Sequence, residues 1–327
     1  MKLVNIFAGH DSNITFYDTE KQEVHIIELE RLVRKRYFRL HVDNDLDSIR
    51  SMLEECKDIA KKFWNFSSPD HVIVTADGGI NPTSVLSDVF ETDSIGMVKN
   101  HHECHASCAH HLSPYNESII FSFDGGGNDG FFNVYHAKNN EIQLLEKIES
   151  DFGGGYMLGA SILHEISDNS HHQLALPGKS MGLCAYGKPR EELVPHFKRF
   201  FFDRDYKKLS KNTELELLNV DKPWENPMNN AKFSEQAAYD LAATPTQKLN
   251  VTYSGIPLLD KEKLKEHIKA RDAKKISISD IARLVKDGNI VGLVYGDSEV
   301  GPRALGNRSI VCDPSFHKMK DSLNAKV

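Results

Sequence analysis

The strongest constraint in this sequence is a pattern of three short apolar segments, separated by polar turns, that occurs twice. The first copy comprises residues 3–8, 13–17 and 23–29, and the second comprises residues 118–123, 131–136 and 142–148. Short apolar segments bounded by Gly, Asn, Asp and Ser are typical of strands joined by turns. Each copy also has an acidic, Gly-containing turn after its first segment. We therefore predict two halves that share one plan, each built on a meander of three strands.

The segments around these copies alternate between helical and strand patterns. Residues 43–63 have apolar side chains at helical spacing, residues 71–75 have a strand pattern, and a helix is expected to begin near His101. Beyond Gly155 the pattern is largely helical, and residues 203–230, which lack periodicity, predict a long surface excursion. The helices expected there are 157–166, 191–202 and 233–243. This alternation predicts an α/β fold.

A separate unit is expected near the C-terminal end of the sequence. Ser279 can cap a helix that ends at Lys286, and residues 290–295 form an apolar run typical of a buried strand. We place a boundary near residue 272, which predicts one domain of residues 1–272 and a second of residues 273–327.

Composition excludes several classes of protein. Forty basic and 47 acidic residues give a net charge of −7, so no overall field attracts the chain to nucleic acid or to acidic membranes. No window approaches the roughly 18 apolar residues of a membrane span, and the first residues lack the apolar core of a signal peptide. Five cysteines, an odd number, indicate reduced thiols. We expect a cytoplasmic protein without a membrane partner.

The most informative motif is a His-rich segment at residues 101–111. On a helix, His101 and His105 lie one turn apart on the same face, so both imidazoles can reach one metal ion. Asp124, at the end of the next strand, can supply a carboxylate ligand. Two alternatives stay open: a His-rich surface helix without an ion, and a zinc site of His101, His105 and Cys108.

Turns in both halves also carry candidate groups. The consecutive residues Gly125, Gly126 and Gly127 would let backbone amides approach a phosphate, although a simple Gly-rich hairpin has the same sequence. In the first half, His10 stands beside Asp11 and can act as a general base. The alternative is a turn in which Asp11 and Ser12 cap local backbone groups.

Three further segments place cations where anions could bind. Residues 31–39 hold five cations, including Arg34 and Arg36, which predict either a grip on an anionic substrate or a solvated loop. Residues 176–187 contain one lysine among three glycines without the spacing of a P-loop. Residues 296–310 bring two arginines, a serine and several glycines after a buried strand, which indicates an oxyanion or phosphate cradle or, alternatively, a structural turn.

Taken together, these motifs resemble the nodulation-type O-carbamoyltransferases, the NodU/TobZ family. The resemblance covers most of residues 1–190 and 276–327, and the stretch from Gly301 to Ser309 is its most specific part. The motifs that carry it, in family order, are His10-Asp11-Ser12, Glu28-Leu29-Glu30-Arg31, His101-His102-Glu103-Cys104-His105-Ala106, Asp124-Gly125-Gly126-Gly127, Gly178-Lys179-Ser180-Met181-Gly182-Leu183 and Gly301-Pro302-Arg303-Ala304-Leu305-Gly306-Asn307-Arg308-Ser309.

The resemblance implies a fold and a reaction. An N-terminal domain of the actin-like ATPase (ASKHA) superfold would be followed by the start of a YrdC-like domain. Carbamoyl phosphate and ATP would form carbamoyl adenylate, and the carbamoyl group would pass to a hydroxyl of a sugar, an antibiotic-like compound, or a hydroxymethylated nucleobase or nucleotide. ATP with Mg²⁺ and Fe(II) or another divalent metal would be the cofactors.

The resemblance also implies roles for individual residues. His101, His105 and Asp124 would hold the metal, and His10, beside Asp11, would deprotonate the acceptor. The other roles are nucleotide contacts from Gly125, Gly126, Gly127, Lys179 and Gly182, activation of carbamoyl phosphate and ATP by Arg303, Arg308 and Ser309, and acceptor binding by Arg34 and Arg36.

The sequence departs from the family pattern in two places. The Gly-Gly-x-x-x-Asn and Gly-Asp-Ala-Gly segments that follow residues 235–243 in the family do not occur, and the family continues past residue 327. We therefore expect a shortened second half, which leaves three interpretations: an incomplete sequence, a protein completed by a partner chain or homodimer, or an inactive remnant. Two alternative functions also stay open, an ATPase or kinase of the same superfold and a metal- or nucleotide-binding subunit without catalysis.

Overall fold

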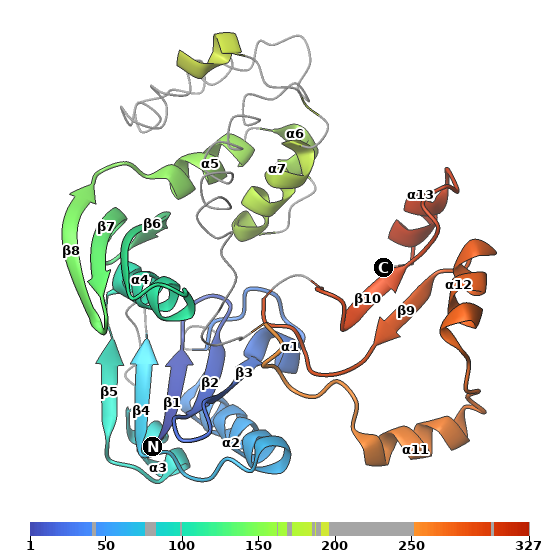
Figure 1. Ribbon diagram of the computed structural model, residues 1–327, viewed down its shortest axis with the longest axis horizontal. Coiled ribbons are helices and arrows are strands. Elements are labelled where there is room, and N and C mark those ends of the chain that lie inside the picture. The colour runs from blue at the N-terminus through green and yellow to red at the C-terminus, as the bar shows by residue number, and fades with distance from the viewer. Residues whose placement is uncertain are drawn as a thin grey trace. The chain divides into compact units, whose positions relative to one another are not determined.

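The computed structural model describes ten segments of the chain, which form two compact units (Figure 1). One unit comprises Met1–Met97 and Asn250–Val327, and the other comprises Val98–Leu249. The predicted domain boundary near residue 272 stays a prediction. The described segments are residues 1–40, 44–75, 83–98, 100–161, 163–168, 172–184, 187, 191–195, 252–301 and 304–326.

The N-terminal unit is built on a sheet of five strands in the order β3-β2-β1-β4-β5. Strands β1, β2 and β3 are antiparallel neighbours, whereas β1 and β4 are parallel. The predicted first meander is therefore confirmed. The strands are β1 (Lys2–Phe7), β2 (Asn13–Asp18), β3 (Glu23–Glu28), β4 (His71–Thr75) and β5 (Ile95–Val98), and the helices are α1 (Leu29–Val33), α2 (Leu46–Trp64) and α3 (Thr83–Phe90).

Helix α2 covers the core of this sheet, as its apolar spacing predicts. Its start is fixed by Asp45, whose carboxylate accepts a hydrogen bond of 2.7 Å from the backbone N–H of Ser48. Its inward residues recur every three or four positions and pack in one cluster with apolar side chains of β1, β2 and β4. These inward residues are Ile49, Leu53, Cys56 and Ala60.

The other unit contains the second predicted meander, which is also confirmed. Strands β6 (Glu117–Gly127), β7 (Gly130–Lys138) and β8 (Glu141–Ile148) form an antiparallel sheet, and α4 (His101–Leu112) packs on it. Figure 1 shows α4 lying across these strands. Strand β6 is longer than expected, because the pairing resumes at Gly127 after an irregularity that follows Phe123. Glycine permits this irregularity, since Gly126 has a φ of 120°.

The helical segment after Gly155 differs in detail from the prediction. The prediction of a single helix at residues 157–166 is wrong, because α5 ends at Ser161 and the backbone of Leu163, just before α6, is extended. Of the predicted helix 191–202, the described part is a 3₁₀ turn at Glu191–Leu193 followed by helical residues 194–195. The remaining residues 196–202 and the predictions for 203–230 and 233–243 lie outside the described residues. The elements are α5 (Phe152–Ser161), α6 (His164–Ser167), η1 (Gln173–Ala175), α7 (Leu176–Cys184) and η2 (Glu191–Leu193).

The C-terminal segment belongs to the first unit and contains α11 (Lys261–Ala270), α12 (Ile278–Lys286), β9 (Val291–Val294), β10 (Arg308–Val311) and α13 (Met319–Asn324). The predicted strand at 290–295 is confirmed as β9. The predicted helix ending at Lys286 is confirmed, but its cap is Ser277 and not Ser279. Ser277 Oγ accepts a hydrogen bond from Asp280 N, and the Asp280 carboxylate accepts one from Ser277 N. Among the helices of the described segments, none has both the length and the apolar character that crossing a membrane requires.

The chain between β9 and β10 folds around the buried side chain of Glu299, which has no exposed surface. Its Oε2 accepts a hydrogen bond of 2.7 Å from Arg308 Nε. Its Oε1 accepts three more from backbone N–H groups, those of Leu305 at 3.0 Å, Asn307 at 2.7 Å and Arg308 at 3.1 Å. Burial raises the pKa of Glu299, but Arg308 and the backbone donors outweigh it and lower the pKa to about 2.

This arrangement predicts a dependence of stability on acid. The pKa of Glu299 lies below its ordinary value of 4.5, so protonation favours the unfolded state. The stabilisation is full above about pH 4.5 and is lost as the pH falls through about 2. In Glu299→Gln, we expect the free energy of unfolding at pH 7 to fall by about 2 kcal/mol, because the half-buried Arg308 guanidinium loses its charged partner.

Urea denaturation at pH 7 and pH 3 measures this effect. Glu266→Gln, which removes an exposed carboxylate from α11, is the matched control and should leave the unfolding free energy unchanged. Equal stabilities of wild type and Glu299→Gln at pH 7 would contradict the assignment.

Candidate functional site

Three side chains predicted as metal ligands converge in the second unit. His101 Nε2 lies 3.0 Å from Asp124 Oδ2, and His105 Nε2 lies 3.4 Å from the same oxygen. The two Nε2 atoms are 3.1 Å apart, and one ligand atom from each residue falls within 4.8 Å of the others. Helix α4 and strand β6 therefore bring two imidazoles and one carboxylate to a single point.

The β6–β7 turn fixes the start of helix α4. Asn128 Oδ1 accepts a hydrogen bond of 3.1 Å from His101 N, and the Asp129 carboxylate accepts from His102 N at 3.0 Å and from Glu103 N at 3.3 Å. These are N–H groups of the first turn, which have no partner within the helix. Sequence reasoning missed Asn128 and Asp129, although two Asx residues in a hairpin turn are a signal for capping.

The glycines after Asp124 allow close approach of neighbouring backbone. A Cβ atom on Gly127 would lie 2.6 Å from His101 Cβ, and one on Gly153 of α5 would lie 2.3 Å from Gly125 N. A larger residue at either position would push α4 or α5 away from β6. The predicted contact of Gly125, Gly126 and Gly127 with a nucleotide stays a prediction.

Electrostatics at this point favour an ionised carboxylate. Hydrogen bonds from His101 and then from His105 hold the pKa of Asp124 well below its ordinary value, although burial opposes the shift. The neighbouring His102 is different, because its side chain is fully buried. Its Nδ1 lies 2.8 Å from Ser122 Oγ and its Nε2 lies 3.0 Å from the Gly130 carbonyl oxygen, so both ring nitrogens are occupied. Burial lowers the pKa of His102, which indicates a structural, neutral histidine.

The ligand set fits a divalent transition metal. Two imidazole nitrogens and one carboxylate oxygen leave open coordination positions, as in the two-histidine, one-carboxylate sites that bind Fe(II). The side chains of His105 and Asp124 are 55% and 48% exposed, so small ligands have access. Cys108, the third ligand of the zinc alternative, is not among the groups that converge within the described part of the chain.

In the other unit, His10 and Asp11 form an exposed pair. His10 Nδ1 lies 2.7 Å from Asp11 Oδ2, and Asp11 has a φ of 58°. Ser12 is buried and organises the turn: its Oγ donates to the Gly9 carbonyl oxygen at 2.5 Å and accepts from Leu40 N at 2.9 Å. Ser12 therefore caps backbone groups, as the turn alternative expects. The role of His10 as a base stays a prediction.

The predicted cationic groups have different surroundings. Arg34, at the end of α1, and Arg36 are exposed, which leaves them accessible to an anionic ligand. Arg308 is bound to Glu299, and Ser309 pairs with Leu293 in the β9–β10 hairpin. Arg303 lies outside the described residues.

Lys179 and Gly182 lie on the exposed side of α7, which packs against α5. A Cβ atom on Gly182 would meet nothing within 4 Å, so packing does not require glycine there. Their predicted contact with a nucleotide therefore stays a prediction.

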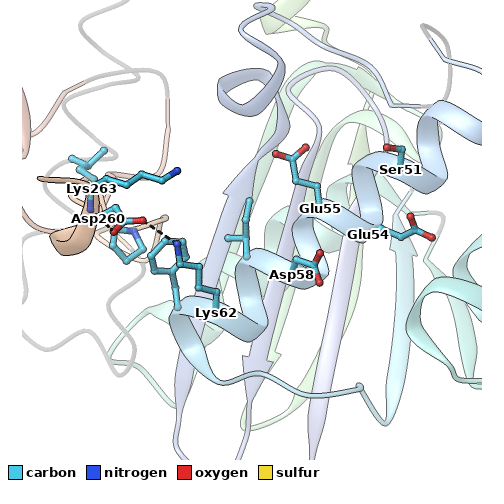
Figure 2. A pocket seen from close by; sticks show the side chains of 11 residues that line it. Ser51, Glu54, Glu55, Asp58, Lys62, Asp260 and Lys263 are labelled. Atoms are coloured by element: carbon cyan, nitrogen blue, oxygen red, sulfur yellow. Dashed lines mark hydrogen bonds and ion pairs between the residues drawn. The ribbon is translucent and has the colours of Figure 1, made fainter. Parts of the chain in front are cut away.

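An open groove of about 610 Å³ lies between α2 and residues 257–263 (Figure 2). Glu54, Glu55 and Asp58 line it on the α2 side, and Lys62 Nζ bridges to Asp260 at 2.9 Å. No predicted site residue lines this groove.

Comparison with known proteins identifies the family. A family model described as "Carbamoyltransferase N-terminus" matches residues 82–271, and one described as "Carbamoyltransferase C-terminus" matches residues 282–327. The chain is 25% identical over 352 residues to nodulation protein NolNO of Sinorhizobium fredii, covering 80% of this chain and 50% of that protein. It is 24% identical over 339 residues to an uncharacterized protein of Methanocaldococcus jannaschii, covering 74% and 55%.

A shorter and stronger match is to nodulation protein NolO of Bradyrhizobium diazoefficiens, with 51% identity over 49 residues, or 15% of this chain and 9% of that protein. The chain spans about half the length of these two relatives from Sinorhizobium fredii and Methanocaldococcus jannaschii, which it matches over 80% and 74% of its own length. Because the N-terminal family model alone covers more than half of the chain, this protein belongs to the carbamoyltransferase family.

Proposed function

We propose that this chain takes part in ATP-dependent O-carbamoyl transfer. Carbamoyl phosphate, ATP and water form carbamoyl adenylate with release of phosphate and pyrophosphate, and a hydroxyl acceptor then receives the carbamoyl group as AMP leaves. The observation that carries the proposal is the convergence of His101, His105 and Asp124 inside the region that matches the carbamoyltransferase N-terminal model. Similarity to the family model does not by itself require that three metal-ligating side chains lie together, so the similarity and the geometry are independent observations that support each other.

His101, His105 and Asp124 would hold a divalent cation, Fe(II) or another metal of similar preference. When bound, the cation supplies positive charge that stabilises the negative charge of a nucleotide phosphate. The backbone amides of Gly125, Gly126 and Gly127 follow Asp124 directly in the chain, so we place the phosphates of ATP, with its Mg²⁺, beside them. Helix α5 packs against both β6 and α7, which supports Lys179 and Gly182 as further nucleotide contacts.

The strand order supports an actin-like (ASKHA) fold for the carbamoyl-transfer part. In the N-terminal unit a meander of three antiparallel strands continues into a parallel strand, in the order β3-β2-β1-β4-β5, and the second meander repeats the first. We propose that residues from about 273 onward begin a YrdC-like activation domain. Within it, Arg303, Arg308 and Ser309 would contact carbamoyl phosphate or ATP.

The acceptor would be a hydroxyl-bearing small molecule or nucleotide. His10, held by Asp11 at 2.7 Å, would take the proton of the acceptor hydroxyl. The exposed guanidinium groups of Arg34 and Arg36 would bind an anionic acceptor.

The metal assignment predicts the effect of removing single ligands. In Asp124→Asn and His105→Ala, we expect bound Fe(II) to fall by more than about tenfold. Each change removes a side chain that binds the metal directly, and even the loss of a group that only orients a ligand costs about tenfold or more in affinity. Elemental analysis and equilibrium dialysis with Fe(II) and Zn(II) measure the loss. Cys108→Ala is the control and should bind metal like the wild type. Loss of metal in Cys108→Ala with retention in Asp124→Asn would instead indicate the His-His-Cys zinc site.

The proposed reaction predicts that pyrophosphate release from ATP depends on carbamoyl phosphate. Pyrophosphate and carbamoyl-AMP are measured with and without carbamoyl phosphate, on protein whose intact mass equals that of the 327-residue chain. We expect both products only when carbamoyl phosphate is present. ATP turnover that ignores carbamoyl phosphate would favour an ATPase or kinase, and bound metal without any turnover would favour a binding subunit.

A further inference from the structure

Two motifs separated by about 270 residues meet in the N-terminal unit. Glu28 ends β3, Arg31 lies on α1, and both contact Gly301 in the loop between β9 and β10. Gly301 N donates a hydrogen bond of 2.9 Å to Glu28 Oε1, and Arg31 Nη2 donates to the Gly301 carbonyl oxygen. Arg31 Nε donates to Glu28 Oε2 as well, so the two side chains form one clamp.

The clamp occupies both polar groups of the Gly301 backbone. Gly301 has a φ of 103°, a conformation that other residues rarely adopt, and Glu28 is only 15% exposed. A further hydrogen bond of 2.7 Å, from Ile26 N to the Ser254 carbonyl oxygen, joins residues 252–256 to β3. Those residues are bonded in turn to the loop, since Gly255 N donates to the Ser298 carbonyl oxygen at 3.0 Å and Val300 N donates to the Thr252 carbonyl oxygen at 2.9 Å. The loop is therefore attached to the N-terminal sheet at more than one point.

Glu299 and the clamp do different work on this loop. Glu299 belongs to the loop itself, and its carboxylate accepts hydrogen bonds from the backbone N–H groups of Leu305 and Asn307 and from the guanidinium of Arg308. The Glu28–Arg31 clamp acts from outside and sets where the loop lies against β3 and α1. The side chain of Arg308 is 22% exposed, whereas that of Glu299 has no exposed surface.

We propose that Glu28 and Arg31 are positioning residues: they hold Gly301 and the neighbouring Glu299, whose carboxylate binds Arg308, so that Arg308 and Ser309 lie in the orientation in which they bind a phosphate-bearing carbamoyl donor. The inference rests on the proposed function, in which Arg308 and Ser309 contact that donor. The physical reason is preorganisation: a loop held in its binding conformation does not lose further conformational freedom when the ligand arrives. Arginine suits this role because its planar guanidinium can donate to a carboxylate and a carbonyl oxygen at the same time.

Isothermal titration with carbamoyl phosphate and with inorganic phosphate tests the clamp on the full chain. The variants are Glu28→Gln, Arg31→Gln and Arg31→Lys. Arg50→Gln is the matched control: it removes the same charge from an ion pair with Asp88 in the same unit, at 2.8 Å, that does not touch the loop. Thermal unfolding and Fe(II) content are recorded for every variant.

We expect carbamoyl phosphate to bind about tenfold more weakly to all three clamp variants, because each removes a charge-assisted hydrogen bond. Arg50→Gln should bind like the wild type, and Fe(II) content should be unchanged throughout. Arg31→Lys is decisive, because lysine keeps the positive charge but lacks the planar guanidinium that donates to a carboxylate and a carbonyl oxygen at the same time.

Two results would overturn the inference and leave the proposed function intact. One is wild-type affinity in Arg31→Lys, which would mean that charge alone matters. The other is equal affinity in all clamp variants and Arg50→Gln. If the wild type itself binds neither probe, the donor site of the proposed function fails, and the positioning role fails with it.

Discussion

The start of helix α4 is satisfied by hydrogen bonds from outside the helix, and the candidate metal centre depends on them. Asn128 and Asp129 accept from the first backbone N–H groups of α4, while Gly127 lets the helix lie directly against the hairpin. Since the same hairpin carries Asp124, one short segment sets both the carboxylate and the rotation of the helix that bears the two histidines. The ligand geometry is thus a property of the β6–β7 hairpin more than of the histidines themselves.

Two carboxylates with strongly lowered pKa values have opposite relations to ligands. Asp124 owes its lowered pKa to hydrogen bonds from two imidazoles on an accessible surface, where a cation can reach the same three side chains. Glu299 owes its acidity to Arg308 and to backbone donors, and its own side chain has no exposed surface. A lowered pKa therefore marks a functional site only together with accessibility.

Local patterns in the sequence predicted much of the fold and the ligand set. The two meanders follow from alternating apolar segments, and the grouping of His101, His105 and Asp124 follows from helical spacing and the strand after it. The break between α5 and α6 was not predictable, because the apolar spacing continues across it while the backbone of Leu163 is extended. Ser279 was predicted as the cap of α12, whereas the capping box with Asp280, three residues after Ser277, makes Ser277 the cap.

Contacts between distant segments had no signal in the sequence. Arg308, one of the two arginines that predicted a cradle at residues 296–310, is bound to Glu299, a contact that the sequence pattern did not indicate. The predicted binding of an anionic ligand there stays a prediction. Glu28 and Arg31 lie in or next to a charged segment for which the sequence predicted contact with solvent or with an anionic substrate. Their partner is a backbone group about 270 residues away, and backbone groups carry no residue-specific pattern that could identify it.

The division of the first unit between residues 1–97 and 250–327 has a consequence for synthesis on the ribosome. Strand β3 is an edge of its sheet, and the backbone that covers part of it, at Ser254, is translated only after the entire second unit. A nascent chain therefore carries an open strand edge for the time needed to add more than 150 residues, a period in which pairing with another chain competes with correct closure. The contact between Ile26 and Ser254 therefore cannot form until residue 254 has been translated, so the order of synthesis decides when this edge is covered.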